Sequence, residues 1–305
     1  MELMNFILDK LRQFGIPEIE IERYNEPHRF YHNFQHIEKM VNDAKNQDVL
    51  TDDLFLAIIF HDIIYDPKAN DNEENSAELF YSYIKNDEIK QAILETKTHT
   101  PTSKLSKQLC DLDLSILWGD YETFIDFENK IFKEYQFVDC NTYKEKRLEI
   151  LSDFGINPEW LNYLKYRTPK IAVYAGSFNP FHKGHYNILK KAEQIFDKVI
   201  IARGVNPEKN NKNIDLPTKI QNRQIETYNG LLTDFIEGLG YDVTLIRGLR
   251  NATDLQYELT QYRFLQDLNP NIKIVSLFCD KEYEHISSSA IRSLELYNKQ
   301  DKYLL

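Results

Sequence analysis

The stretch that most constrains the fold lies just past the middle of the chain, where an apolar run is followed at once by a glycine- and histidine-containing loop. The run Ile171–Tyr174 is typical of a short buried strand, and the segment Ala175-Gly-Ser-Phe-Asn-Pro-Phe-His-Lys-Gly-His185 leads into a helical pattern. Gly176 allows a close approach of the backbone to a ligand, Pro180 turns the chain, and Gly184 removes a side chain where the helix begins. A strand, a loop and a helix in this order predict an α/β fold.

The rest of the second half repeats this alternation. Thr168-Pro169 marks a break, after which apolar strands alternate with helical stretches, and this predicts a Rossmann-like parallel sheet with helices on both faces and a ligand crevice at the carboxyl ends of the strands. The expected strands are Ile171–Tyr174, Lys198–Ala202, Val243–Ile246 and Ile272–Phe278.

The first half has a different character, because amphipathic helical patterns fill it and strand-like runs are few. Examples are Met1–Phe14, Glu73–Ile84 and Tyr121–Tyr135. A chain of 305 residues is long enough for two cores. We therefore expect an all-α domain over residues 1–167 and an α/β domain over residues 168–305.

Three segments of the second half are suited to bind phosphate. The free amides at the start of the helix after the loop favour an anion, and His182 and His185 lie three residues apart, so both can donate to phosphate oxygens; together they should form a small cationic pocket. The serines of Glu284-His-Ile-Ser-Ser-Ser-Ala-Ile-Arg292 suit a capped helix start, and the arginines of Leu245-Ile-Arg-Gly-Leu-Arg250 suit a phosphate clamp. These patterns predict chemistry on a nucleotide phosphate.

The same segments resemble the HxGH and ISSSxxR signatures of the nucleotidyltransferase superfamily. The string IRGLR followed by Asp254-Leu-Gln-Tyr-Glu258 is more similar to phosphopantetheine adenylyltransferases than to the nicotinamide mononucleotide members. The resemblance implies attack by a substrate phosphate on the α phosphorus of ATP, with Mg²⁺, and 4′-phosphopantetheine as acceptor; nicotinamide mononucleotide is the alternative. The segment Pro217-Thr-Lys-Ile departs from the acidic helix start of the family, in a region that helps to shape the acceptor pocket.

The resemblance also implies roles for single residues. His185 would be the main transition-state histidine, His182 its partner at the α phosphate, and Lys209 a mobile-loop lysine that contacts the transferring phosphate. Glu258 would accept from the ribose hydroxyls, and Arg292 would bind the β and γ phosphates. The full nucleotide- and substrate-binding set would be Gly176, Ser177, Phe178, Arg247, Gly248, Arg250, Glu258, Ser287, Ser288, Ser289 and Arg292.

The first half carries a second group of motifs. Tyr31-His-Asn-Phe-Gln-His36 places two histidines four residues apart, as on one helix face, and Phe60-His-Asp62 follows the apolar run Leu54–Phe60, which predicts a buried helix. Asp111-Leu-Asp113 supplies a further carboxylate. Imidazoles and carboxylates together are the usual ligands of a divalent transition metal.

These strings resemble the HD superfamily of metal-dependent phosphohydrolases, in particular a predicted hydrolase branch with YHN, HD and LDLSIL strings. The ligands of a Mn, Fe, Co or Mg ion would be His36, His61, Asp62 and Asp113. The metal would activate a water, and His32 would donate a proton to the leaving oxygen, as in the cyclic nucleotide phosphodiesterases with a similar string. Glu73, Glu74 and His99 are weaker candidates for outer contacts.

Composition limits the partners. A net charge of −11 argues against an extended nucleic-acid surface, and the longest apolar runs fall short of about eighteen residues, so we expect a soluble cytoplasmic protein without membrane contact. The three cysteines, Cys110, Cys140 and Cys279, lack metal or disulfide spacing and should be reduced thiols. The expected partners are ATP and a phosphorylated acceptor, and resemblance to the adenylyltransferases favours a homo-oligomer.

Three classes of function remain open at this point. The first is a bifunctional enzyme with adenylyl transfer in the second half and phosphate ester or anhydride hydrolysis in the first. The second is an adenylyltransferase whose HD domain is a regulatory nucleotide-binding or oligomerisation module. The third is a nucleotide-binding scaffold without turnover. The presence of both residue sets favours the first class.

Overall fold

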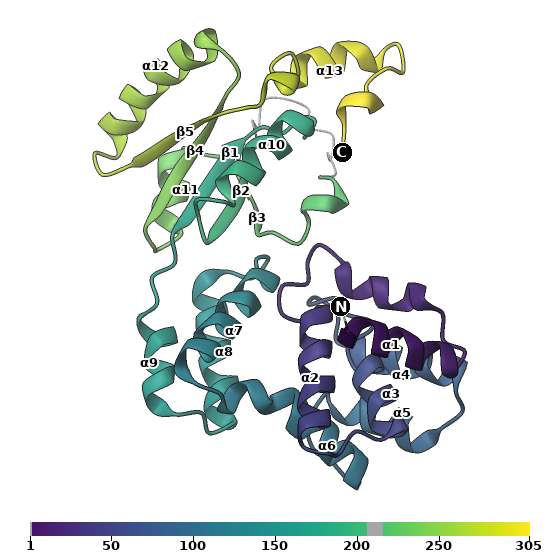
Figure 1. Cartoon of the computed structure of the whole chain (residues 1–305). Helices are drawn as coiled ribbons and strands as arrows, with labels where there is room; N and C mark the ends of the chain where they lie inside the picture. The colour runs from purple at the N-terminus through teal and green to yellow at the C-terminus, as the bar shows by residue number, and fades with distance from the viewer. Residues whose placement is uncertain (1, 206–215) are drawn as a thin grey trace. The chain divides into compact units, whose positions relative to one another are not determined.

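The chain folds into two compact units, seen in a computed structural model that describes residues 2–205 and 216–305 (Figure 1). The first unit comprises Met1–Glu134 and Glu149–Tyr163, and the second comprises Tyr135–Leu148 and Leu164–Leu305. The chain thus enters the second unit twice. The limits of residues 1–167 and 168–305 stay a prediction.

All regular elements described in the first unit are helical. The α-helices are α1 (Glu2–Gln13), α2 (Phe34–Asn46), α3 (Asp52–Phe60), α4 (Asn72–Tyr83), α5 (Asp87–Glu95), α6 (Lys104–Asp113) and α7 (Tyr121–Glu134). Two 3-10 helices, Glu18–Asn25 and Leu114–Trp118, join them, and α8 (Cys140–Asp153) and α9 (Pro158–Tyr166) hold residues of both units. The expectation of a helical first half is confirmed.

Local capping explains where several of these helices begin. The side chains of Asn33, Thr51, Asn86 and Ser103 each accept a hydrogen bond from a backbone amide at a helix start. Every residue of Leu54–Phe60 in α3 is buried, as the apolar run predicts, and α3 packs in the centre of the first core. His61 and Asp62, which follow α3 directly, are therefore attached to a buried helix.

The second unit contains a five-stranded parallel sheet in the order β3-β2-β1-β4-β5. The strands are β1 (Ile171–Gly176), β2 (Lys198–Gly204), β3 (Ile225–Tyr228), β4 (Val243–Leu249) and β5 (Lys273–Phe278). Ile171 of β1 pairs with Lys198 of β2 and with Val243 of β4, so β1 is central. The four expected strands are present, whereas β3 was not expected.

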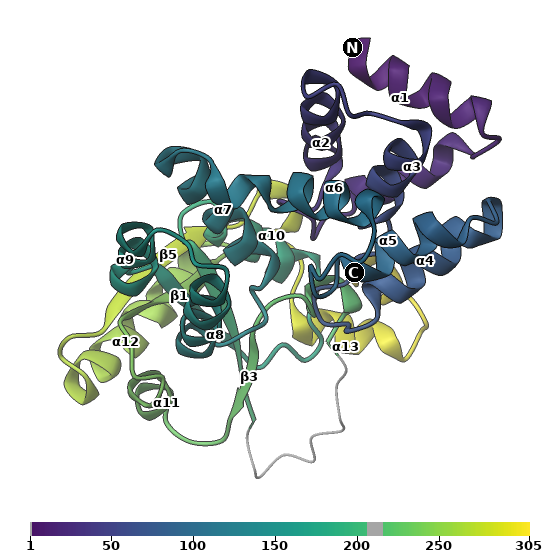
Figure 2. The same ribbon diagram turned by 90° about the horizontal axis from the view of Figure 1, so that it is seen from below.

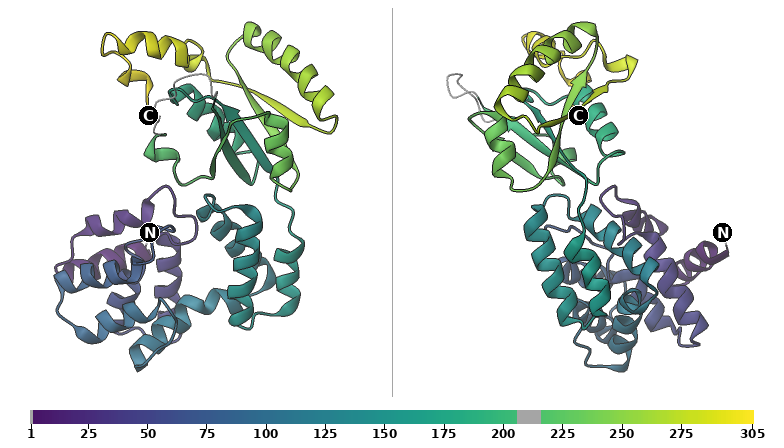
Figure 3. Two further views of the ribbon diagram at one scale, coloured as in Figure 1. Left: turned by 180° about the vertical axis from the view of Figure 1, so that it is seen from behind. Right: turned by 90° about the vertical axis from the view of Figure 1, so that its left-hand side faces the viewer.

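Helices cover both faces of this sheet, as expected (Figures 2 and 3). Ile188 and Leu189 of α10 pack on one face, and Ile236 of α11 and Leu265 of α12 pack on the other. The helices are α10 (Lys183–Ala192), α11 (Leu232–Gly238), α12 (Ala252–Leu268) and α13 (Ser288–Glu295), with 3-10 turns at Thr218–Ile220, Lys281–Tyr283 and Asp301–Tyr303.

The carboxyl ends of β1, β4 and β5 lead to helix starts. β1 runs into the loop before α10, β4 into α12, and β5 into the segment before α13. Because parallel strands end at the same edge, these loops gather there. Within the described part of the chain, a membrane-spanning helix of the required length and apolarity is not found.

Candidate functional sites

A pocket of about 550 Å³ lies in the second unit at the ends of β1 and β4. Most of the expected nucleotide-site residues line it: Gly176, Phe178, His182, His185, Arg247, Gly248, Arg250, Glu258, Ser287, Ser288 and Ser289. Among the described residues, Ser177 and Arg292 belong to the same loops but are not part of the lining. Lys209 lies outside the described residues.

The two histidines of the phosphate loop cap α10 together. Nδ1 of His182 accepts from the backbone amide of His185 at 3.3 Å, and Nδ1 of His185 accepts from the amide of His182 at 3.4 Å. The rings stack with centroids 3.6 Å apart. Because each Nδ1 accepts a hydrogen bond, the proton of each neutral ring sits on Nε2 and is free to donate to a ligand.

These histidines are neutral at pH 7, so the expected cationic pocket is wrong in this respect. Burial lowers the pKa of His182 to about 4, and the charge of Arg250 adds to this. Burial, followed by the charges of His182 and Arg250, lowers the pKa of His185 well below its usual value. The pair therefore offers two N–H donors, and the positive charge comes from the arginines.

The phosphate loop is shaped by its own aromatic residue. Phe178 is buried and adopts a positive φ of 46°. A Cβ on Gly176 would lie only 2.9 Å from the Phe178 ring, so glycine is needed there to admit the ring. The loop is tied to the serine motif, because the hydroxyl of Ser288 donates to the carbonyl of Pro180 at 3.1 Å and the Arg292 guanidinium donates to the carbonyl of Asn179.

Both arginines of the β4 segment are paired with acids of α12. Nε of Arg247 lies 3.1 Å from a carboxylate oxygen of Glu258. Nε and Nη2 of Arg250 each donate to Asp254 at 2.8 Å. The carboxylate of Glu258, expected to accept from a ribose, thus has an arginine partner, and Asp254 is a pocket residue to which the sequence assigned no role.

The serine motif begins α13. Ser287 is the N-cap residue, and its hydroxyl accepts from the amide of Ala290 at 3.1 Å. Nη1 of Arg250 lies 3.3 Å from the carbonyl oxygen of Ile286, just before the cap. The start of α13 therefore shares the pocket with the start of α10, and both present amides that suit an anion.

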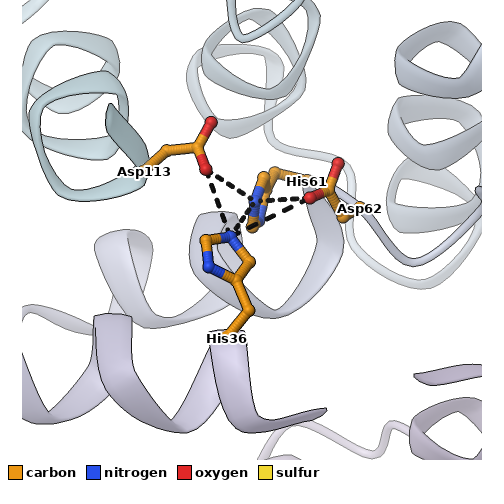
Figure 4. Close-up of side chains that lie close together, drawn as sticks. All are labelled: His36, His61, Asp62 and Asp113. Carbon is orange, nitrogen blue, oxygen red and sulfur yellow. Dashed lines mark hydrogen bonds and ion pairs between the residues drawn. The ribbon is translucent and has the colours of Figure 1, made fainter. Parts of the chain in front are cut away.

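In the first unit, the four expected metal ligands come together, with their side chains pointing toward one another (Figure 4). His36 lies on α2, His61 and Asp62 follow α3, and Asp113 ends α6. Nε2 of His36 is 3.3 Å from Nε2 of His61 and 3.1 Å from Oδ1 of Asp113, and Nε2 of His61 is 3.1 Å from Oδ2 of Asp62. One ligand atom from each residue lies within 4.8 Å of the others.

The donor set fits a divalent cation. Nδ1 of His61 lies 2.9 Å from the carbonyl oxygen of Ile58, which can only accept, so this nitrogen carries a proton, and in the neutral form that a metal requires Nε2 would direct its lone pair into the cluster. Two carboxylates face the same point. Burial alone would raise the pKa values of Asp62 and Asp113 and lower that of His61. In the cluster the opposite charges stabilise one another, so the pKa values of the two carboxyl groups are lowered and that of His61 is raised well above its usual value. Such a cluster needs a proton or a metal at its centre. Nδ1 of His36 is buried without a hydrogen-bond partner among the described residues.

His32 lies beside this cluster but not on the helix face expected from its spacing to His36. It precedes the N-cap residue Asn33, so it belongs to the loop before α2. Its Nδ1 lies 2.6 Å from a carboxylate oxygen of Glu134, and its ring stacks on Tyr65 at 4.3 Å between centroids. The expectation of a shared helix face is wrong because Asn33 begins the helix.

Glu134 is the most heavily bonded acid near the cluster, and the sequence did not single it out. One of its oxygens accepts from the amides of Phe30, Tyr31 and His32, and the other contacts the His32 ring and accepts from the hydroxyl of Tyr65 at 2.8 Å. Burial would raise the pKa of Glu134, but His32 and these hydrogen bonds lower it to about 2. Burial would lower the pKa of His32, but the Glu134 charge raises it.

Outer contacts complete the first site. The guanidinium of Arg29, which is buried, donates to the carbonyls of His32, Asp62 and Ile63 and so fixes both loops of the cluster. Nε2 of His99 lies 2.9 Å from the second oxygen of Asp113. Glu73 and Glu74 lie outside the four-residue cluster and pair with Lys97.

Comparisons with known proteins concern the second unit. A cytidylyltransferase-like family model matches residues 173–294. The chain is 39% identical over 141 residues to a phosphopantetheine adenylyltransferase of Mycoplasma capricolum, covering 43% of this chain and 99% of that protein. It is 33% identical over 143 residues to a phosphopantetheine adenylyltransferase of Rhodopirellula baltica, covering 44% of this chain and 79% of the relative.

A solved structure overlaps more weakly. It is a bifunctional NMN adenylyltransferase/ADP ribose pyrophosphatase from Francisella tularensis in complex with AMP and a manganese ion, with 18% identity and a TM-score of 0.32 over 45% of this chain and 44% of that chain. A likeness at this level supports no argument. The Mycoplasma capricolum relative, in contrast, is matched over 99% of its length at 39% identity. Through the adenylyl-transferring domain at its C-terminal end, the chain belongs to the phosphopantetheine adenylyltransferase family.

Proposed function

We propose that the C-terminal domain transfers AMP from ATP to 4′-phosphopantetheine, giving dephospho-CoA and pyrophosphate. We propose further that the first unit hydrolyses a phosphate ester or anhydride with a bound divalent metal. For the transferase, the observation that carries the acceptor is the 39% identity to a phosphopantetheine adenylyltransferase over 99% of its length. For the hydrolase, it is the convergence of two imidazoles and two carboxylates on one point.

In the transferase reaction, an oxygen of the acceptor phosphate forms a bond to the α phosphorus of ATP, and the bond to the bridging oxygen of pyrophosphate breaks. The Nε2–H groups of His182 and His185 would donate to the α phosphate as charge builds there. Amides at the starts of α10 and α13 and the guanidinium of Arg292 would hold the other phosphates. Mg²⁺ bound with ATP would neutralise part of the phosphate charge.

Two of the expected roles require either the movement of a side chain or a residue outside the part of the chain that the structure describes. Glu258 would bind the ribose hydroxyls after Arg247, now 3.1 Å from its carboxylate, turns to a phosphate. Lys209 would contact the transferring phosphate, as the family resemblance implies. Neither role changes the position of the histidine pair, which forms the capping box at the start of α10.

In the first unit, the ligands would be His36, His61, Asp62 and Asp113. A divalent ion held there, Mn, Fe, Co or Mg, would supply Lewis acidity and a nucleophilic water near neutral pH. His32, held by Glu134, would give its proton to the leaving oxygen, and Tyr65 keeps the imidazole ring in place by stacking. Arg29 holds the carbonyls of both loops, so the ligand geometry is fixed before substrate arrives.

Pyrophosphate release by the full-length protein tests the transferase. With ATP and Mg²⁺, kcat/KM should be at least about a hundredfold higher for 4′-phosphopantetheine than for nicotinamide mononucleotide. The reverse preference would make the chain a nicotinamide mononucleotide adenylyltransferase. Binding of ATP with no pyrophosphate released from either acceptor would contradict both readings.

A panel of phosphate esters and anhydrides with Mn²⁺, Mg²⁺, Co²⁺ and Fe²⁺ tests the hydrolase. Asp62→Ala should strip the metal and abolish hydrolysis while adenylyl transfer continues at the wild-type rate. If the wild type hydrolyses none of the panel and Asp62→Ala alters only the response of the transferase to nucleotides, the first unit is a regulatory module.

A further inference from the structure

Arg250 is held by an acid of its own neighbouring helix. Asp254 lies in the first turn of α12, four residues after Arg250, which follows β4 directly. One carboxylate oxygen accepts from the Arg250 backbone amide at 2.9 Å and from Nε at 2.8 Å, and the other accepts from Nη2 at 2.8 Å. The hydrogen bonds to the guanidinium raise the pKa of Arg250 and lower that of Asp254.

This grip fixes which edge of the guanidinium remains open. The five N–H groups form a planar fork, and Asp254 takes the side formed by Nε and Nη2. Nη1 is also drawn toward the carbonyl of Ile286 at 3.3 Å, just before the serine motif. Nη1 and Nη2 each keep a second hydrogen, and a guanidinium can donate two such hydrogens to two phosphate oxygens at once.

The Arg250 guanidinium lies in the pocket that is expected to bind the nucleotide. Arg250, Asp254 and the serines of the α13 start line the same pocket. Burial is the main cause of the lowered pKa values of His182 and His185, and the charge of Arg250 lowers both of them further. The guanidinium therefore shares one pocket with the histidine pair and the serine motif.

We infer that Asp254 is a positioning residue for ATP, which holds the Arg250 guanidinium in the one orientation that meets the triphosphate with two parallel N–H donors. The inference rests on the proposed role of Arg250 as a phosphate ligand. Asp254 itself does not touch the nucleotide in this account, since a carboxylate repels phosphate.

Because of that repulsion, the direction in which ATP affinity changes on removal of the carboxylate tests the inference. A carboxylate that merely neutralised Arg250 would weaken ATP binding, so its removal would tighten binding. A carboxylate that orients the fork does the opposite: its removal frees the side chain, and ATP must then restrict it on binding.

The test uses Asp254→Asn in the full-length protein, with ATP and Mg²⁺ as the probe in calorimetry. Asparagine retains the oxygen that accepts from the Arg250 backbone amide and Nε, so the turn is preserved, but its NH2 group cannot accept from Nη2 and its side chain carries no charge. We expect ATP affinity to fall about tenfold and the KM for ATP to rise to match. The KM for the acceptor should stay within about twofold. Asp254→Ser, which also keeps an oxygen acceptor, repeats the test should the first variant fail to fold.

A control variant and the Arg250→Ala background complete the test and separate the inference from its premise. Asp242→Asn removes an exposed acid that pairs with Lys273 at the opposite end of β4, and it should bind ATP as the wild type does. In an Arg250→Ala background, Asp254→Asn should have no further effect, because a residue that acts through Arg250 loses its influence with it.

Unchanged or tighter ATP binding in Asp254→Asn overturns the inference. So does an equal loss of affinity in the Arg250→Ala background, since Asp254 would then act through the helix start. If Arg250→Ala alone binds ATP as the wild type does, the proposed phosphate role of Arg250 fails first. That result leaves the acceptor assay and the family assignment untouched.

Discussion

Asp113 offers the sharpest test of the candidate metal centre, because one of its oxygens faces both imidazoles. Oδ1 lies 3.1 Å from Nε2 of His36 and 3.7 Å from Nε2 of His61. Asp113→Asn preserves the shape of the side chain but removes its charge. Asp111→Asn is the matched control, because Asp111 lies two residues earlier on α6, is exposed, and pairs with Lys107 at 2.8 Å.

The size of the effect follows from binding linkage. A metal at a hundred times its Kd stabilises the folded state by about 2.7 kcal/mol. A unit of about 150 residues gains about 2 to 4 °C in Tm for each kcal/mol, so the wild type should gain about 5 to 11 °C. Loss of a charged ligand should weaken binding at least about a hundredfold. The same metal concentration then stabilises Asp113→Asn by about 0.4 kcal/mol, or about 1 to 2 °C.

Thermal unfolding of the full-length protein by circular dichroism, after chelation and again with Mn²⁺, Co²⁺, Fe²⁺ or Mg²⁺, measures this difference. Asp111→Asn should show the same gain in Tm as the wild type. Equal gains in Asp111→Asn and Asp113→Asn would refute the ligand assignment. A wild type that gains nothing from any of these ions would refute the metal centre itself.

The other sites lead to three further predictions. His185→Ala should slow adenylyl transfer about a hundred- to a thousandfold while ATP still binds, because a donor aimed at developing charge is worth about 3 to 4 kcal/mol; wild-type turnover in a pyrophosphate assay would remove it from the mechanism. Glu134→Gln should lower hydrolysis by the first unit about tenfold or more with metal content unchanged, since an uncharged amide holds His32 less firmly in its protonated form; loss of metal instead would mean that Glu134 supports the ligands. Because the pKa of His182 is about 4 when folded and about 6.5 when unfolded, the unfolded state binds the proton first. The contribution of His182 to the free energy of unfolding should therefore fall by about 1.4 kcal/mol for each pH unit from about 6.5 down to 4, seen in urea unfolding as the difference in slope between the wild type and His182→Gln.

Local sequence signals were enough to predict much of the second unit. The strand, loop and helix around Gly176 are adjacent in the chain, and the long apolar strands stand out from their surroundings. β3 was missed because the strand has only four residues, Ile225–Tyr228, and half of them are polar. The neutral state of the histidine pair was missed because the loss of water around His182 depends on packing that no local pattern records.

In the first unit, the ligand types and order predicted which residues converge, but their support was not visible. Glu134 reaches His32 across 102 positions, and in the sequence it is one more acid in an amphipathic helix. Arg29 likewise acts through carbonyl groups, which any residue could provide. The start of α2 could have been placed correctly, because Asn33 is a preferred N-cap residue and its side chain accepts from the amide of Gln35.

In the proposed transfer, a neutral histidine pair at the start of α10 holds the phosphate that is attacked. A crystal structure of the full-length protein with α,β-methylene ATP and Mg²⁺ tests it directly. We expect α-phosphate oxygens within hydrogen-bond distance of Nε2 of both His182 and His185, with the remaining phosphates at the start of α13. An analogue bound with its α phosphate away from these nitrogens, or a pocket that stays closed to it, would contradict the claim.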